Sequence, residues 1–104
     1  MIKIKESDIQ KACMDYLNIK RIFAWRNNSG SFKTERGGFY RMGTPGSPDI
    51  IAVIKGRFIG IECKTIKGKQ NDNQKEFEKK LVKSGGLYMI VRSAEELQEL
   101  LTQL

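Results

Sequence analysis

Three charged residues near the middle of the chain are spaced so that they could share one site. Residues 57–64 have the composition of a strand, on which Glu62 and Lys64, two positions apart, point to the same face. Asp49 begins the preceding apolar segment, and Lys55-Gly56 between the two segments suits a hairpin turn. Asp49 precedes that turn by as many residues as Glu62 follows it. The two carboxylates are therefore expected to face each other at about 5 Å.

Paired carboxylates between apolar strands are unfavourable unless a cation offsets their repulsion. Hard oxygen ligands suit Mg²⁺ or Mn²⁺, with water and a phosphate oxygen completing the shell. Lys64 would add a positive charge that lowers the pKa of bound water, positions it, or stabilises charge on the phosphate. The chain has no histidine, which excludes triad hydrolysis and histidine acid–base catalysis. The alternative is structural: Asp49 caps a turn after Pro48, and Glu62 and Lys64 form a solvated strand face.

The surrounding sequence predicts an α/β domain that would position these residues. In chain order we expect a helix (about 5–18), a strand (21–26), a long polar segment without regular structure (27–48), a hairpin (49–54 and 57–64), a helix (71–84), a strand (87–91) and a helix (94–104). The order α-β-β-β-α-β-α predicts a mixed sheet flanked by helices, with a right-handed parallel crossover through the second helix. At 104 residues the chain is expected to form one domain, residues 1–104.

Apolar stripes predict which helix faces are buried. The stripes are Ile9, Ala12, Cys13, Tyr16 and Leu17 in the first helix, Phe77, Leu81 and Val82 in the second, and Leu97, Leu100 and Leu101 in the third. Ser93 and Glu96 fit a capping box at the third helix. At the first helix, a capping box of Ser7 and Gln10 would place Glu6 just before the first turn; otherwise Glu6 lies inside that turn. The sequence leaves both open.

The charge balance favours a polyanionic partner. The chain has 19 basic and 12 acidic residues, a formal charge of +7, which suits nucleic acid first and an anionic membrane surface second. No stretch approaches the roughly 18 apolar residues of a membrane span, and the N-terminus does not have the pattern of a signal peptide. Two cysteines without histidine make a structural zinc site improbable, and both fit a core in a reducing compartment. We therefore expect a cytoplasmic protein that needs no membrane.

The loop 27–47 within the polar segment is the candidate surface for DNA. Its basic residues could meet phosphates, and the aromatic residues Phe32, Phe39 and Tyr40 could stack on exposed bases. The candidate DNA-binding residues, including two lysines just past the Glu62 strand, are Arg26, Asn27, Asn28, Lys33, Arg36, Arg41, Lys67 and Lys69. The alternative is a solvated loop without a ligand.

One combination of motifs points to a family. Ser47-Pro48-Asp49, Gly60-Ile61-Glu62-Cys63-Lys64-Thr65, Gly68-Lys69 and Gln74 resemble the restriction-endonuclease-like P-D…(D/E)-x-K nucleases. More narrowly, they resemble the VRR-NUC family, especially its stand-alone phage-type members. The resemblance covers essentially the whole chain and implies a restriction-endonuclease-like core.

The resemblance also implies roles for individual residues. Asp49 and Glu62 would be the central ligands of Mg²⁺ or Mn²⁺, with the backbone carbonyl of Cys63 as another. Lys64 would be the catalytic lysine, and Gln74 would match the helical glutamine near it. Glu6 would match the acidic residue of the first helix that completes the metal shell, although an acidic residue is also favourable at any helix N-terminus.

The expected function is metal-dependent endonucleolytic cleavage of DNA, including branched, Holliday-junction-like forms. One subunit of this size offers one site, so cutting two strands would need a homodimer. The family resemblance places such a protein in a bacterial cell or a phage-infected host. Two rivals use the same basic surface without catalysis: a DNA-binding module, and an RNA-binding protein of ribosomal type.

Overall fold

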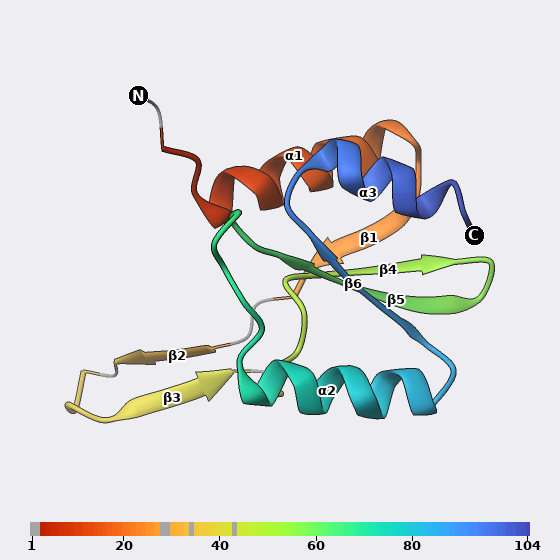
Figure 1. Ribbon diagram of the computed structural model, residues 1–104. Coiled ribbons are helices and arrows are strands. Elements are labelled where there is room, and N and C mark those ends of the chain that lie inside the picture. The colour runs from red at the N-terminus through yellow and green to blue at the C-terminus, as the bar shows by residue number, and fades with distance from the viewer. Residues whose placement is uncertain (1–2, 28–29, 34, 43) are drawn as a thin grey trace.

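A computed structural model describes residues 3–27, 30–33, 35–42 and 44–104 (Figure 1). Its helices and strands follow the chain as α1 (Glu6–Ile19), β1 (Phe23–Arg26), β2 (Gly30–Lys33), β3 (Phe39–Met42), β4 (Ile50–Ile54), β5 (Arg57–Cys63), α2 (Asp72–Lys83), β6 (Leu87–Val91) and α3 (Ala94–Leu101). Four strands form one sheet in the order β1-β4-β5-β6, while β2 and β3 form a separate two-stranded sheet.

The main sheet is mixed, as predicted. β1, β4 and β5 pair antiparallel, whereas β6 lies parallel to β5 after the connection through α2. Figure 1 shows α1 and α3 on one face of this sheet and α2 on the other. The α/β class with helices flanking a mixed sheet is therefore confirmed. None of the helices in the described ranges is both long and apolar enough to cross a membrane.

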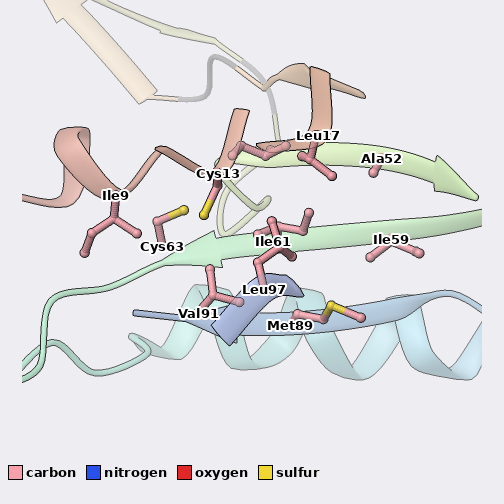
Figure 2. Close-up of a cluster of buried hydrophobic side chains, with 11 residues drawn as sticks. Ile9, Cys13, Leu17, Ala52, Ile59, Ile61, Cys63, Met89, Val91 and Leu97 are labelled. Atoms are coloured by element: carbon pink, nitrogen blue, oxygen red, sulfur yellow. The ribbon is translucent and has the colours of Figure 1, made fainter. Parts of the chain in front are cut away.

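The hydrophobic core lies between the sheet and the α1–α3 layer (Figure 2). Alternate residues of the buried strands point into it because successive strand side chains face opposite sides of a sheet. The buried cluster is Ile9, Cys13, Leu17, Ile50, Ala52, Ile59, Ile61, Cys63, Met89, Val91 and Leu97. Both cysteines are free thiols within it, as predicted. A hydrogen bond with Cys13, together with burial, holds the pKa of Cys63 well above its usual range.

The hairpin that carries the candidate site has the predicted two-residue turn. Ile54 and Arg57 are paired, and Lys55 and Gly56 both adopt positive φ, at 53° and 77°. Two consecutive left-handed residues define a type I′ turn, whose twist matches that of the flanking strands. The turn therefore fixes the register between β4 and β5.

The prediction of an irregular segment over residues 27–48 was wrong, and the strand count rises accordingly. β2 and β3 pair antiparallel with Phe32 opposite Tyr40, and in Figure 1 this hairpin extends away from the main sheet. Between the two strands Glu35 and Arg36 form a turn, and Gly37 follows at a φ of +82°. The high content of glycine and charge concealed two four-residue strands, which are too short to show a clear period.

Smaller expectations at the helices also needed correction. Glu6 lies inside the first turn of α1, and Lys5 is the N-cap, with its backbone N–H donating to Asp8 Oδ2 at 2.9 Å instead of a Ser7–Gln10 box. Ala12 is exposed on α1, and Val82 is 54% exposed on α2. α2 lies mainly along β6, and the apolar residues that it half-buries are Phe77 and Leu81.

The third helix is shorter than expected. α3 ends at Leu101, and Ser93 caps it by accepting a hydrogen bond from the Glu96 backbone N–H at 3.1 Å. Leu97 is fully buried and the neighbouring leucines of the stripe are half-buried, as the amphipathic pattern predicted.

Candidate active site

Asp49 and Glu62 meet at the open end of the β4–β5 hairpin. The register continues from the pair Ile50 and Ile61, so the next facing pair is Asp49 and Glu62. The Asp49 carbonyl accepts from the Asn27 backbone N–H at 2.8 Å, which turns the Asp49 backbone toward β1 and away from β5. Facing residues that do not bond to each other bring their side chains closest together. This local geometry explains the contact between the two carboxyl groups.

Glu62 is a buried acid. It is 2% exposed, and the Tyr88 hydroxyl donates to its Oε2 at 3.2 Å. The pKa of Glu62 is raised to about 8, first by burial and then by a hydrogen bond with Asp49 and the Asp49 charge, against opposing effects of Lys64 and Tyr88. A carboxyl group with such a pKa keeps its proton at neutral pH when no cation compensates its charge. A divalent cation would be able to replace that proton.

Asp49 is held from two directions. Its Oδ2 accepts from the backbone N–H of Cys63 at 2.8 Å. The Asn27 side-chain amide donates to Ser47 Oγ at 2.8 Å and to the Pro48 carbonyl at 3.0 Å, which fixes the segment leading into Asp49. Asn27, which the sequence suggested as a DNA ligand, therefore has a structural use in this fold: it ties the end of β1 to the acidic residue.

Lys64 shares the face of Glu62 and is itself nearly buried. It is 8% exposed, and its backbone N–H donates to the Val91 carbonyl at 3.0 Å. The turn of residues 65–68 folds back onto it, so that a Cβ at Gly68 would lie 3.3 Å from the Lys64 side chain. Arg92 holds that turn by donating to the carbonyls of Thr65 and Gly68. The lysine is thus positioned by packing along its stem.

Tyr88 belongs to the site, although sequence reasoning missed it. In the parallel register Gly60 pairs with Tyr88, so Tyr88 lies on the Glu62 face of the sheet. Burial raises the pKa of the Tyr88 hydroxyl, and the Glu62 charge adds to that increase. The available signal was the Tyr88 hydroxyl, a single polar group in the apolar strand 87–91. Once β5 and β6 pair in this register, Tyr88 lies on the same face of the sheet as Glu62.

Glu6 and Gln74 do not join the carboxylate pair. Glu6 is exposed on the first turn of α1. Over the described ranges, no group of three or more His, Cys, Asp or Glu side chains is placed to hold a metal ion. Gln74 Oε1 accepts from the Asn71 backbone N–H at 2.9 Å in a capping box at the start of α2. Glu6 is thus no part of such a group, while Gln74 has a structural role in this cap and its place near Lys64 stays a prediction.

The donor set nevertheless suits one hard divalent cation. Asp49 and Glu62 supply carboxylate oxygens, and the Cys63 carbonyl lies on the same strand edge as the Cys63 N–H that reaches Asp49. Three oxygen donors leave positions for water and a phosphate oxygen, which is common for Mg²⁺. The proton that the raised pKa of Glu62 retains is what such a cation would displace.

The basic residues suggested for DNA contact come from several parts of the fold. Arg26, Arg36, Lys67 and Lys69 are exposed. Lys67 lines a cleft of about 560 Å³ together with Lys3, Ile4, Ile66 and Arg92. Lys33 and Arg41 lie on β2 and β3, although their side chains are outside the described part, as is all of Asn28.

The loop before Asp49 rests against the first turn of α2 through Gly46. Gly46 has a φ of +79°, and a Cβ there would lie 2.1 Å from the Asn73 carbonyl oxygen. We expect Gly46→Ala to lower the free energy of unfolding by about 3 kcal/mol, because it adds a backbone clash to the cost of about 1–2 kcal/mol for a left-handed residue. Urea unfolding followed by circular dichroism measures this.

Gly56→Ala is the matched control for that substitution. Gly56 has a φ of +77° and nothing within 4 Å of its Cβ position, so it reports the backbone cost alone. Gly56→Ala should lower the free energy of unfolding by about 1 kcal/mol. If the two variants lost the same free energy of unfolding, this would contradict the close approach of the loop to α2.

Comparison with known proteins adds no family to this description. No model of a protein family matches the chain, and no curated protein matches it either. Any function assigned to the chain therefore depends on the site itself.

Proposed function

We propose that this protein is a metal-dependent DNA endonuclease with a restriction-endonuclease-like core, similar to the VRR-NUC family. The single observation that carries the proposal is the contact of the half-buried Asp49 with the buried Glu62, with the buried Lys64 on the same face. Burying Glu62 and Lys64 beside a third charged group costs free energy that a purely structural role does not explain. Paired carboxylates that can hold a divalent ion, together with a nearby lysine, can support phosphodiester hydrolysis in a chain without histidine.

Each residue has a definite task in this proposal. Asp49, Glu62 and the Cys63 carbonyl would hold Mg²⁺ or Mn²⁺, and the ion would supply Lewis acidity and activate water. Lys64 places a positive charge beside the reacting phosphate and stabilises the charge that develops there. Tyr88 orients Glu62 through its hydroxyl. Asn27 and Cys63 keep Asp49 in place through the bonds described above.

The substrate class follows from charge. A chain of formal charge +7 with exposed Arg26, Arg36, Lys67 and Lys69 suits the phosphate backbone of DNA. We propose branched DNA, of the Holliday-junction kind, as the form that is cut, and a homodimer as the species that cuts both strands. The proposed setting is the cytoplasm of a bacterial or phage-infected cell.

Cleavage of labelled DNA tests the proposal directly. We expect branched DNA to be nicked with Mg²⁺ or Mn²⁺ and to stay intact in EDTA. Glu62→Gln should reduce the rate by at least about 100-fold, since it removes a carboxylate that holds the ion. Glu99→Gln, an exposed carboxylate on α3, is the matched control and should cleave normally.

The outcomes of this assay separate the proposed enzyme from its rivals. Binding without cleavage in every metal would instead favour a non-catalytic DNA- or RNA-binding module. Cleavage that persists in Glu62→Gln would place the active site elsewhere.

A further inference from the structure

Two exposed aromatic side chains lie together on the edge strand of the main sheet. Phe23 is 70% exposed and Trp25 is 40% exposed, and their ring centroids are 5.2 Å apart. Large apolar side chains seldom gather in this way on a surface without a binding role. Their neighbours Ile22 and Ala24 pack against the buried cluster, whereas Phe23 and Trp25 are not part of this packing.

The pair occupies the same face of the sheet as the carboxylates. Trp25 is paired with Ile51, and Ile51 with Gly60, so all three positions share one face. Gly60 is two residues from Glu62 and approaches Leu81 of α2, which identifies this face as the α2 side. α2 lies along β6 and leaves the β1 end of the face open.

The distance to the site suits a nucleic-acid strand. β1 and β5 are separated only by β4, and the register offsets Trp25 by two residues and Phe23 by four from Glu62, which puts them about 12 Å and about 16 Å from Glu62 along the sheet. These lengths correspond to about four to five stacked nucleotides of one strand at 3.4 Å each. A strand that places a phosphate at the carboxylates and runs across the sheet toward β1 would reach Trp25 and then Phe23.

The charge around the pair also favours a polyanion over a second copy of the chain. Residues 16–34 contain Lys20, Arg21, Arg26 and Lys33 and no acidic residue. Lys20, Arg21 and Arg26 are exposed and lie within three residues of Phe23 or Trp25 in the chain. Two copies meeting through this surface would bring like charges together, whereas a phosphate backbone would neutralise them.

We propose that Phe23 and Trp25 form a stacking platform for unpaired bases about four to five nucleotides from the cleaved phosphate. The inference rests on the proposed function and narrows its substrate to DNA that carries unpaired nucleotides near the cut. Aromatic faces bind unpaired bases of any sequence, while bases inside a duplex are already stacked and cannot reach them.

Trp25 is the only tryptophan of the chain, so its fluorescence reports this surface directly. In EDTA, where no cleavage is expected, an oligothymidylate of about ten nucleotides should quench it, and a blunt duplex should quench it far less. Trp25→Leu keeps an apolar side chain but removes the ring. We expect it to weaken oligothymidylate binding about tenfold, measured by anisotropy of a labelled strand, and duplex binding less than twofold.

Two further variants distinguish base stacking from a general loss of exposed apolar surface. Phe23→Leu should weaken the same binding and leave duplex binding unchanged, whereas Ile19→Ala, at a 78% exposed apolar residue on α1, should have no effect. Absent quenching, or equal losses for both DNA forms, would overturn the platform. So would dissociation of a dimer by Trp25→Leu in sedimentation equilibrium, because the surface would then join two copies.

The cleavage assay and the quenching assay fail independently. If unpaired DNA quenches the fluorescence but the protein cleaves no DNA, the proposed nuclease activity is wrong and the stacking platform stands. If the protein cleaves DNA without such quenching, only the platform is wrong.

Discussion

Lys64→Ala is expected to yield a folded protein that binds DNA but cleaves it about 100- to 1000-fold more slowly. A preorganised positive group beside a developing negative charge contributes an effect of this size in a site that excludes water. Lys64 meets both conditions, because its side chain is nearly buried and lies on the face of Glu62. Single-turnover cleavage of labelled branched DNA in Mn²⁺ measures the rate, and circular dichroism checks the fold.

Lys79→Ala is the matched control for the lysine. Lys79 is exposed on α2, so its loss removes one positive charge without touching the carboxylate pair. It should weaken DNA binding slightly and leave the single-turnover rate within about twofold. If Lys64→Ala cleaves as fast as Lys79→Ala, the lysine has no part in the reaction.

The metal-free protein is expected to lose stability as the pH rises from about 5 to about 9. Glu62 has a pKa of about 8 in the folded protein against an ordinary 4.5, with burial as the first cause. Below the ordinary value the carboxyl is protonated in both states, and its contribution to stability is fully present. Between the two values the unfolded chain loses the proton first, so stability falls until the folded pKa has been passed.

The expected size of this effect is on the order of a few kcal/mol, or roughly 10 to 20 °C in melting temperature for a domain of this length. Thermal unfolding in EDTA across this pH range measures it. Glu62→Gln keeps the shape of the side chain and cannot titrate, so its melting temperature should change little over the same range. A slope that persists in Glu62→Gln would assign the effect to another group.

Bound metal should oppose this loss of stability at high pH. A cation that replaces the Glu62 proton binds more tightly as that proton becomes easier to remove, and binding to the folded state alone raises the stability of the folded protein. We therefore expect Mn²⁺ to raise the melting temperature clearly at about pH 8.5 and little at about pH 5.5. Equal effects at both values would indicate that the ion binds outside the carboxylate pair.

The sequence alone determined the parts of this site that depend on local geometry. The turn at Lys55-Gly56 sets the register of the hairpin, and strand alternation then brings Asp49 opposite Glu62 and puts Lys64 on the same face. The class of fold could be predicted for the same reason, because periodic apolar patterns identify the helices and the longer strands without knowledge of their packing.

The tertiary structure decided everything that depends on which elements become neighbours. Tyr88 reaches Glu62 because β6 lies parallel to β5 in one register, and Asn27 holds Asp49 because β1 pairs with β4. Glu6, by contrast, lies exposed on the first turn of α1 instead of completing a cluster with the carboxylates. A residue's own neighbourhood in the chain carries no record of such contacts, since they are set by how helices and strands pack across long separations. The same reason left the exposed Phe23–Trp25 pair to be found in the fold: alternation placed it on one side of β1, and only the position of α2 showed that this side stays uncovered.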